Sequence, residues 1–147
     1  MSETSSRSVV YTAQFENLDL VRDFVAEAAE ACGLEPAAVY GVQLAVDEAF
    51  TNIIEHAYGG ESDEKIRCDC RIERSALVIS LCDCGKPFNP LDVPAPDLQA
   101  DLEEREVGGL GLYFMNKLMD DVQFAFGKEP ETGKTCNILT MVKRKGA

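Results

Sequence analysis

The segment from Lys65 to Cys82 constrains the fold more than any other part of the sequence. Over residues 65–73, apolar or cysteine side chains alternate with charged ones, which is the period of a strand with one face in water. After a two-residue turn, residues 76–82 are apolar on both faces, as in a central strand. The two runs therefore predict an antiparallel hairpin whose first strand turns a charged face to solvent.

Two amphipathic helices are predicted before this hairpin. The first covers about residues 17–32 and is followed by Gly33, a residue suited to ending a helix. The second begins at Pro36, which fits a first helical turn, and stops near Tyr58, because two glycines follow. Further strands are predicted over residues 8–15, 122–126 and 135–143.

A long loop separates the hairpin from the last helix. Residues 84–107 contain four prolines followed by an acidic run, within which a short helix over 97–105 is predicted. A loop of this length in a compact domain is usually a functional lid or a disordered segment. The glycine-rich stretch 108–112 then opens a helix that ends near Met119. This order of elements predicts an α+β sandwich, with a largely antiparallel sheet and helices on one face.

The composition predicts one folded domain over residues 1–147. The chain is long enough for a substantial core, and 46% hydrophobic with 27% charged residues is typical of a globular protein. Residues 1–8 are polar and are expected to form a flexible N-terminus.

The net charge of -12 argues against binding to nucleic acid or to an anionic membrane, since both need a basic surface. Basic protein partners and a metal-shielded nucleotide remain as options. No apolar run approaches the roughly 20 residues of a membrane span, and the N-terminus lacks a signal peptide's apolar segment. A cytoplasmic location is therefore expected, with the six cysteines mostly reduced.

Two polar groups stand out against apolar surroundings. Glu48 and Asn52 lie four residues apart and emerge on one helix face, where their oxygens are suited to a hydrated metal. A solvated helix face would also carry such a pair. Asp83 ends the central strand beside Gly85, and its carboxylate can accept a hydrogen bond from an amino group. An ordinary turn aspartate is the alternative.

Two glycine-containing stretches are further candidates. Free amide groups at the helix entry 108–112 can bind an anion, although no Walker or Rossmann motif is present and such an entry can be purely structural. Thr135, in Gly133-Lys134-Thr135, has a hydroxyl that can reach a ligand through water, or it is simply a strand residue.

The cysteines and the single histidine allow other interpretations. Cys68 and Cys70 could approach Cys82 and Cys84 across the hairpin and bind zinc, but a one-residue spacing within strands fits structural zinc poorly. Buried reduced cysteines are the simpler explanation. His56 lies near the same helix face as the Glu48 pair, either beside a ligand or on the surface.

The order and spacing of these motifs resemble the N, G1, G2 and G3 boxes of the Bergerat-fold ATPases, over nearly the whole chain. The matching segments are 48–52, 83–88, 108–112 and 133–135. Within that superfamily the chain resembles the bacterial anti-sigma factor serine/threonine kinases, especially in residues 48–58 and 119–122. The resemblance implies a two-layer Bergerat-type sandwich with a largely antiparallel mixed sheet, in which residues 84–107 form an ATP lid.

The resemblance also assigns ATP and Mg²⁺ as cofactors. Asn52 would give a carbonyl oxygen to Mg²⁺, and Asp83 would accept the adenine amino group with help from Thr135 through water. Gly85 would leave room for the base. The phosphates would be wrapped by Gly109 and Gly111.

For catalysis, the resemblance makes Glu48 the general base that takes the proton from a serine hydroxyl. Kinases of this kind carry an arginine just before the G2 glycines, contacting the γ-phosphate. Val107 occupies that position here, and Arg105, two residues away, is the nearest candidate.

The implied partners are a STAS-type anti-anti-sigma protein as substrate, a sigma factor, and a second copy of the chain in a homodimer. The displaced arginine favours an alternative, a non-catalytic, nucleotide-regulated binding module. A histidine-kinase fragment is disfavoured, because no helical hairpin with a phosphoacceptor histidine precedes the domain and His56 lies inside the nucleotide helix.

Overall fold

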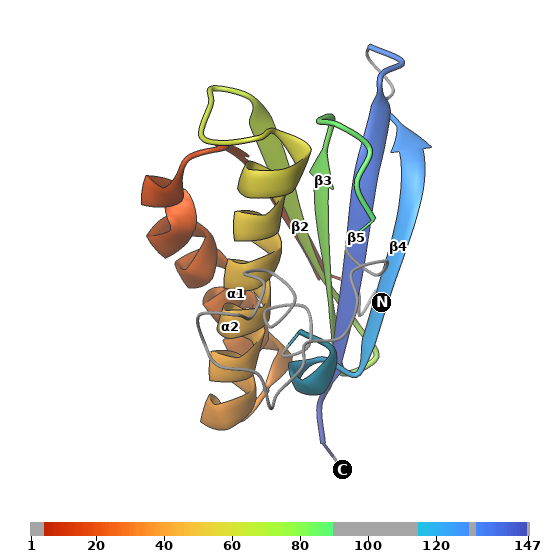
Figure 1. Cartoon of the computed structure of the whole chain (residues 1–147). Coiled ribbons are helices and arrows are strands. Elements are labelled where there is room, and N and C mark those ends of the chain that lie inside the picture. Colours follow the sequence, from red (N-terminus) through yellow and green to blue (C-terminus); the bar gives the residue numbers. More distant parts are fainter. Residues whose placement is uncertain (1–4, 90–114, 130–131, 147) are drawn as a thin grey trace, which may run out of the picture.

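The computed structural model describes residues 5–89, 115–129 and 132–146. They form two layers, a five-stranded sheet and a pair of helices that cover one of its faces (Figure 1). The pair consists of α1 (Leu18–Cys32) and α2 (Pro36–Asn52), with the short helical turn η1 (Phe15–Asn17) before α1 and η2 (Ile53–Ala57) after α2. The strands are β1 (Ser5–Thr12), β2 (Lys65–Glu73), β3 (Ala76–Asp83), β4 (Asp121–Lys128) and β5 (Thr135–Arg144). The predicted α+β class is confirmed.

The sheet has the strand order β1-β2-β3-β5-β4, and each pairing of these described strands is antiparallel. The predicted hairpin is present as β2 and β3, with Glu73 opposite Ala76. Its two turn residues, Arg74 and Ser75, both have positive φ angles, of 49° and 66°. Such angles match the twist of the flanking strands and allow a two-residue connection.

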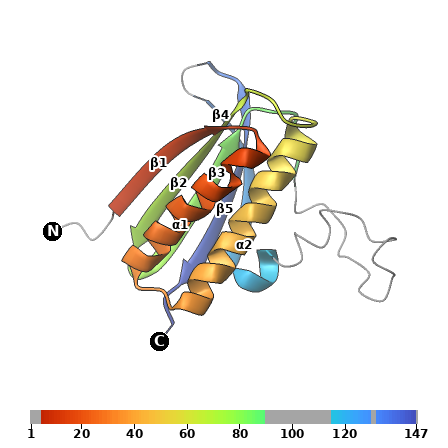
Figure 2. The ribbon, with the colours of Figure 1, turned by 90° about the vertical axis from the view of Figure 1, so that its left-hand side faces the viewer.

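The core lies between the helices and the face of the sheet that Figure 2 shows behind them. The face of β2 that alternation predicts as apolar carries Ile66, Cys68 and Cys70, all buried. The helices contribute fully buried side chains from one stripe of each, among them Val21, Val25, Val42, Val46 and Phe50. The apolar residues that recur with helical spacing in the sequence are therefore the ones that pack against the sheet. Within the described residues, none of the helices combines the length and apolar character needed to cross a membrane.

The helix boundaries follow their local signals. Gly33 adopts φ 88°, the left-handed geometry that ends α1, and its N–H bonds to the carbonyls of Ala29 and Glu30. Pro36 occupies the first turn of α2, where its missing N–H removes no helical hydrogen bond. Both boundary predictions are confirmed.

The first strand differs from its predicted position. It spans Ser5–Thr12 instead of residues 8–15, so Ser5 to Ser8, assigned from sequence to a flexible N-terminus, pair with β2. The reason is that β1 is an edge strand whose polar first half needs no apolar alternation to form backbone hydrogen bonds. Most of the predicted lid, including the helix over residues 97–105, lies outside the described residues. Of the predicted helix after the glycines, residues 115–118 are described and are helical.

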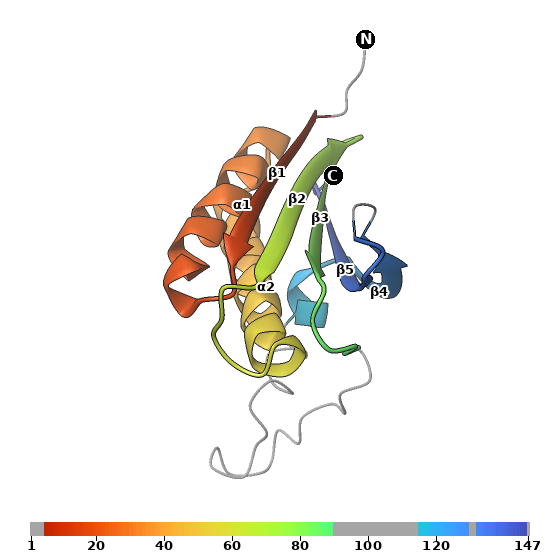
Figure 3. The same ribbon diagram turned by 90° about the horizontal axis from the view of Figure 1, so that it is seen from above.

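The second helix ends in a way that the sequence did not predict. After Asn52 it widens into the π-helical turn η2, where the N–H of Tyr58 bonds to the carbonyl of Ile53 at 3.0 Å, five residues back. The carbonyl of Ala57 accepts instead from the N–H of Lys86, at 2.7 Å. Figure 3 shows this end of the molecule, where η2 meets the chain leaving β3. A helix end and a strand end are thus joined directly.

Candidate functional site

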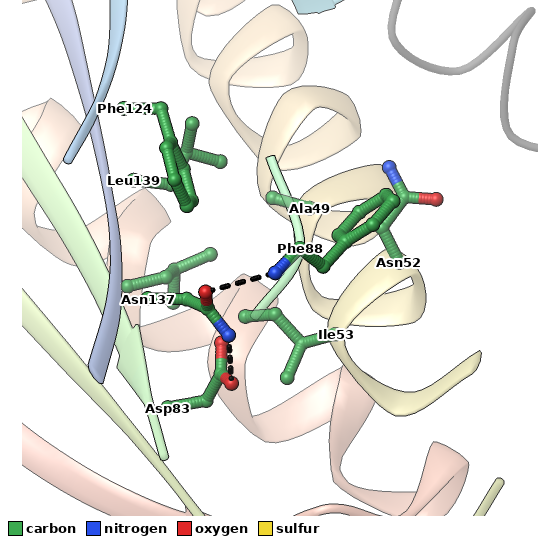
Figure 4. A pocket seen from close by; sticks show the side chains of 9 residues that line it. Ala49, Asn52, Ile53, Asp83, Phe88, Phe124, Asn137 and Leu139 are labelled. Atoms are coloured by element: carbon green, nitrogen blue, oxygen red, sulfur yellow. Dashed lines mark hydrogen bonds between the residues drawn. The ribbon is translucent and has the colours of Figure 1, made fainter. Parts of the chain in front are cut away.

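A pocket lies between the C-terminal end of α2 and the adjoining ends of the sheet strands. It contains about 300 Å³ of empty space, part of it open to solvent. Figure 4 shows Ala49 and Asn52 on the helix side and Asp83 and Asn137 on the sheet side. Its lining residues are Ala49, Asn52, Ile53, Leu81, Asp83, Phe88, Phe124, Asn137 and Leu139. A mostly apolar hollow with a few polar groups is the usual form of a small-molecule site.

Asp83 is the carboxylate of this pocket. The residue is only 3% exposed, and one carboxylate oxygen, Oδ1, accepts two hydrogen bonds. The donors are the Asn137 amide and the Gly85 backbone N–H, each at 2.9 Å. Burial raises the pKa of Asp83 above its usual value, while these two donors act in the opposite direction. Asp83 is therefore held in place by two donors at the pocket wall, and an ionised carboxylate can accept further hydrogen bonds.

Asn137 is a site residue that the sequence analysis missed. Its amide nitrogen also donates to the carbonyl of Lys86 at 3.0 Å, and its oxygen accepts from the N–H of Phe88 at 3.1 Å. A signal was present in the sequence, because Asn137 shares the core-facing parity of Leu139 and Met141 on β5. A polar side chain at a core-facing strand position usually has a specific partner.

Asn52 lies on the helix side of the pocket and is 5% exposed. In the described part of the chain its side chain has no hydrogen-bond partner. A carboxamide that lines a pocket without a protein partner is free to bind a ligand or, through its oxygen, a hard cation such as Mg²⁺. Its position at the last residue of α2, next to the π-helical turn, is typical of π-bulges at functional sites.

Glu48 lies one helical turn before Asn52, next to the pocket residue Ala49 but not in the lining. It is partly buried, and burial is the main reason that its pKa is raised, followed by the charges of Asp47 and Glu55. A raised pKa makes a carboxylate a stronger base than a free glutamate. Among the described residues, Glu48 has no ion pair or hydrogen bond that stabilises its charge, whereas Asp47 forms an ion pair with Arg22 at 3.3 Å.

Comparison with known proteins identifies the family of the chain. Residues 11–143 match the family model of the histidine kinase-like ATPase domain. The serine-protein kinase RsbW of Listeria monocytogenes is 31% identical over 118 residues, which cover 78% of this chain and 75% of the relative. RsbW of Bacillus mycoides is 32% identical over 115 residues, covering 76% of this chain and 71% of the relative. The chain belongs to the RsbW family of serine-protein kinases.

A solved structure supports the same fold for this RsbW-family chain. The crystal structure of the RsbU and RsbW domains of Rv1364c from Mycobacterium tuberculosis aligns with a TM-score of 0.59 at 16% identity. The alignment covers 96% of this chain and 33% of that longer one. At this identity the likeness concerns the fold, and it matches the sandwich predicted from the sequence.

Gly85 has a structural role in this RsbW-family fold. A β-carbon added at Gly85 would lie 2.6 Å from the carbonyl oxygen of Ala57, so only glycine allows β3 and η2 to meet so closely. Tyr58 reinforces the junction, since its hydroxyl donates to the carbonyl of Lys65 at 2.6 Å and accepts from the N–H of Cys84 at 3.2 Å. Gly85 thus fixes the frame of the pocket without lining it.

The remaining sequence-predicted residues lie elsewhere. Thr135 is exposed at the start of β5, opposite Lys128, and does not line the pocket. Arg105, Gly109 and Gly111 lie outside the described residues. His56 is exposed, and its ring stacks on pocket residue Phe88 with ring centroids 4.9 Å apart.

The two Cys-Asp-Cys motifs do not come together across the hairpin as the zinc interpretation requires. In the β2–β3 register, Cys68 faces Leu81 while Cys82 faces Arg67. The offset of one residue puts the two motifs on opposite faces of the sheet, because strand side chains alternate. Among the described residues, no cluster of three histidine, cysteine or acidic side chains is arranged to hold a metal ion.

Proposed function

We propose that this RsbW-family chain is an ATP-dependent protein serine kinase that acts as an anti-sigma factor and phosphorylates a STAS-type anti-anti-sigma protein. One observation carries the proposal. The fold brings Asn52 from α2 and Asp83 from β3 into one pocket, as the N and G1 boxes of a nucleotide site require. The cytoplasmic location stays a prediction from the sequence.

In the proposed complex, the Asp83 carboxylate accepts a hydrogen bond from the adenine amino group. The oxygen of Asn52 would bind Mg²⁺, and its carboxamide, which lines the pocket and has no hydrogen-bond partner among the described residues, fits that role. Mg²⁺ held there would supply charge to neutralise the phosphates. The phosphates are wrapped by Gly109 and Gly111.

In the proposed reaction, the substrate serine hydroxyl attacks the γ-phosphorus while its proton passes to the carboxylate of Glu48. The bond between the γ-phosphorus and the bridging oxygen breaks, and ADP leaves with that oxygen. Burial and the neighbouring acidic residues raise the pKa of Glu48, which favours its role as base. Arg105 is the proposed contact to the γ-phosphate.

The kinase proposal is tested by incubating the protein with radiolabelled ATP, Mg²⁺ and the cognate STAS protein. We expect label on a serine of the STAS protein and none on a variant in which that serine is alanine. ATP binding without transfer of label would reject the kinase reaction. It would support a non-catalytic, nucleotide-regulated module, the alternative that Val107 favours.

The metal role of Asn52 has a separate test by calorimetry. Asn52→Ala should weaken ATP binding about tenfold or more with Mg²⁺ present and change it little in EDTA, because a charge-assisted ligand is lost. Thr51→Ala, one position earlier on α2, is the matched control. An equal loss with and without Mg²⁺ would show that Asn52 does not act through the metal.

The proposed assembly includes a sigma factor and a homodimer. Size-exclusion chromatography with light scattering measures the mass of the protein alone and after addition of the sigma factor. A monomer at all concentrations would reject the dimer, and separate elution would reject the sigma-factor complex.

A further inference from the structure

The amide group of Asn137 connects three parts of the pocket wall. It is 4% exposed, and its two N–H groups donate to Asp83 Oδ1 and to the carbonyl of Lys86. Its oxygen accepts from the N–H of Phe88. The three bonds fix the orientation of the amide, since only nitrogen can donate to a carboxylate and a carbonyl and only oxygen can accept from an N–H.

This arrangement makes the two oxygens of Asp83 different. Oδ1 accepts from both Asn137 and Gly85, so its acceptor capacity is used within the protein. Oδ2 has no partner among the described residues. Oδ2 is nevertheless not fully buried. Among the described residues, the only fully buried side-chain oxygen without a hydrogen-bond partner is Oδ1 of Asp47. Oδ2 is therefore left to accept from a ligand in the pocket.

We propose that Asn137 is a positioning residue that sets the base specificity of the site, by occupying Oδ1 of Asp83 and leaving Oδ2 as the acceptor for a purine's amino group. The inference rests on the proposed function, and it adds a residue outside the four family motifs. A base with a carbonyl in place of the amino group, such as hypoxanthine, presents an acceptor to the acceptor Oδ2. The pocket should thus prefer ATP to ITP.

Protonation of Asp83 should reverse this preference. Because two N–H groups already donate to Oδ1, the proton goes to Oδ2, which then donates and suits a carbonyl better than an amino group. Burial raises the pKa of Asp83, and only the Asn137 and Gly85 donors oppose that shift. Removing Asn137 should raise this pKa further, so that the ATP preference is lost at a higher pH.

The phenol and thiol groups near Asp83 stay uncharged on the acid side of neutrality. Tyr58, from the end of η2, has a pKa raised mainly by burial. On the sheet, burial also raises the pKa values of Cys82 and Cys136, and it raises that of Cys84 to about 12. Glu48 on α2, whose pKa burial also raises, does not line the pocket and should act on ATP and ITP alike, so a change in the ATP-to-ITP ratio between about pH 4 and 7 reports on Asp83.

The experiment measures the dissociation constants of ATP and ITP across this pH range for the full chain and for Asn137→Leu, a side chain of similar size. We expect wild type to prefer ATP by about ten- to a hundredfold near neutral pH, because one hydrogen bond to a charged group is at stake. Asn137→Leu should bring the ATP-to-ITP ratio close to one and move the pH midpoint of ATP binding upward.

Thr140→Val is the matched control. It removes a side-chain hydrogen bond of 3.2 Å between Ser80 of β3 and Thr140 of β5, the same two strands, away from Asp83. Its ATP-to-ITP ratio and pH midpoint should equal those of wild type. Asn137→Ser, which is smaller and polar, serves in place of the leucine variant if that variant does not fold.

The outcomes separate this inference from the proposed function. If wild type binds neither nucleotide, the proposed function fails. If wild type prefers ATP and the Asn137 variants weaken ATP and ITP equally, with an unchanged pH midpoint, Asn137 has only a structural role and the inference is overturned.

Discussion

The two halves of the helical segment 36–57 differ in what they do with polar groups. In the first half, Val42, Ala45 and Val46 are completely buried against the core. In the second half, Glu48 is partly buried with a raised pKa, and Asn52 is buried without a partner in the described residues. The helix then changes to a π-helical turn. Both halves carry core side chains, and the second half adds two polar groups beside a pocket.

This difference indicates where folding and function separate within one element. A partly desolvated carboxylate costs folding free energy, and the Asn52 amide gains no hydrogen bond within the described residues. Such costs are tolerated at sites where a ligand or a reaction uses the groups. Substitutions of core residues in the first half should therefore affect stability, and substitutions of Glu48 and Asn52 in the second half should affect activity.

The largest effect is expected from Glu48→Gln. Loss of a general base should lower the rate of phosphoryl transfer about 10²- to 10⁴-fold, measured in single turnover with saturating ATP. Affinity for ATP should stay close to that of wild type, because Glu48 does not line the pocket. Transfer at the wild-type rate would rule out Glu48 as the base and leave the second half without a catalytic group.

Gly85→Ala tests the junction between the second half and the sheet. The added β-carbon must displace the Ala57 backbone, which should lower the free energy of unfolding by an amount at the upper end of about 1–3 kcal/mol. Denaturant titration measures the loss, and ATP affinity should fall as well. Gly146→Ala, where an added β-carbon meets nothing within 4 Å, is the control. Equal stability of both variants would contradict the close contact.

Val46→Ala should act on the first half alone. A cavity in the core should cost about 2 kcal/mol of stability, while ATP affinity below the unfolding transition remains that of wild type. Leu44→Ala, on the same half but 37% exposed, should cost much less. A strong loss of ATP affinity in folded Val46→Ala would mean that the two halves are not separable.

The smallest expected effect is on the pH dependence of the free energy of unfolding. The folded state binds a proton at Glu48 more tightly than the unfolded state does, because the folded pKa is raised. This group's contribution is fully present below its usual pKa of about 4.3 and is lost as pH rises through the raised value. Glu48→Gln should therefore gain stability relative to wild type between pH 4 and 7. Glu30→Gln, at an exposed glutamate of α1, is the control. If the difference in unfolding free energy between Glu48→Gln and wild type were the same at every pH, Glu48 would not be desolvated in the folded state.

Elements with strong periodicity were predictable from sequence, and geometry set by distant contacts was not. Alternation over Lys65–Glu73 gave β2 its bounds, and the glycine after α1 gave that helix its end. The π-helical turn escaped prediction because it depends on Lys86, which arrives from another element. Thr135 was chosen by motif position, whereas Asn137, two residues on, faces the pocket because of the β3–β5 register.

The hydrogen bond from Lys86 to Ala57 has a consequence for the order of binding events. Because this bond and those of Asn137 exist within the protein alone, the pocket wall that we propose as the base site is already hydrogen-bonded before any nucleotide arrives. The conformational entropy of these wall residues is therefore lost when the protein folds and does not have to be lost again when the nucleotide binds. The base end of the ligand can therefore dock first, as an anchor, so adenosine without phosphates should compete with ATP for the pocket.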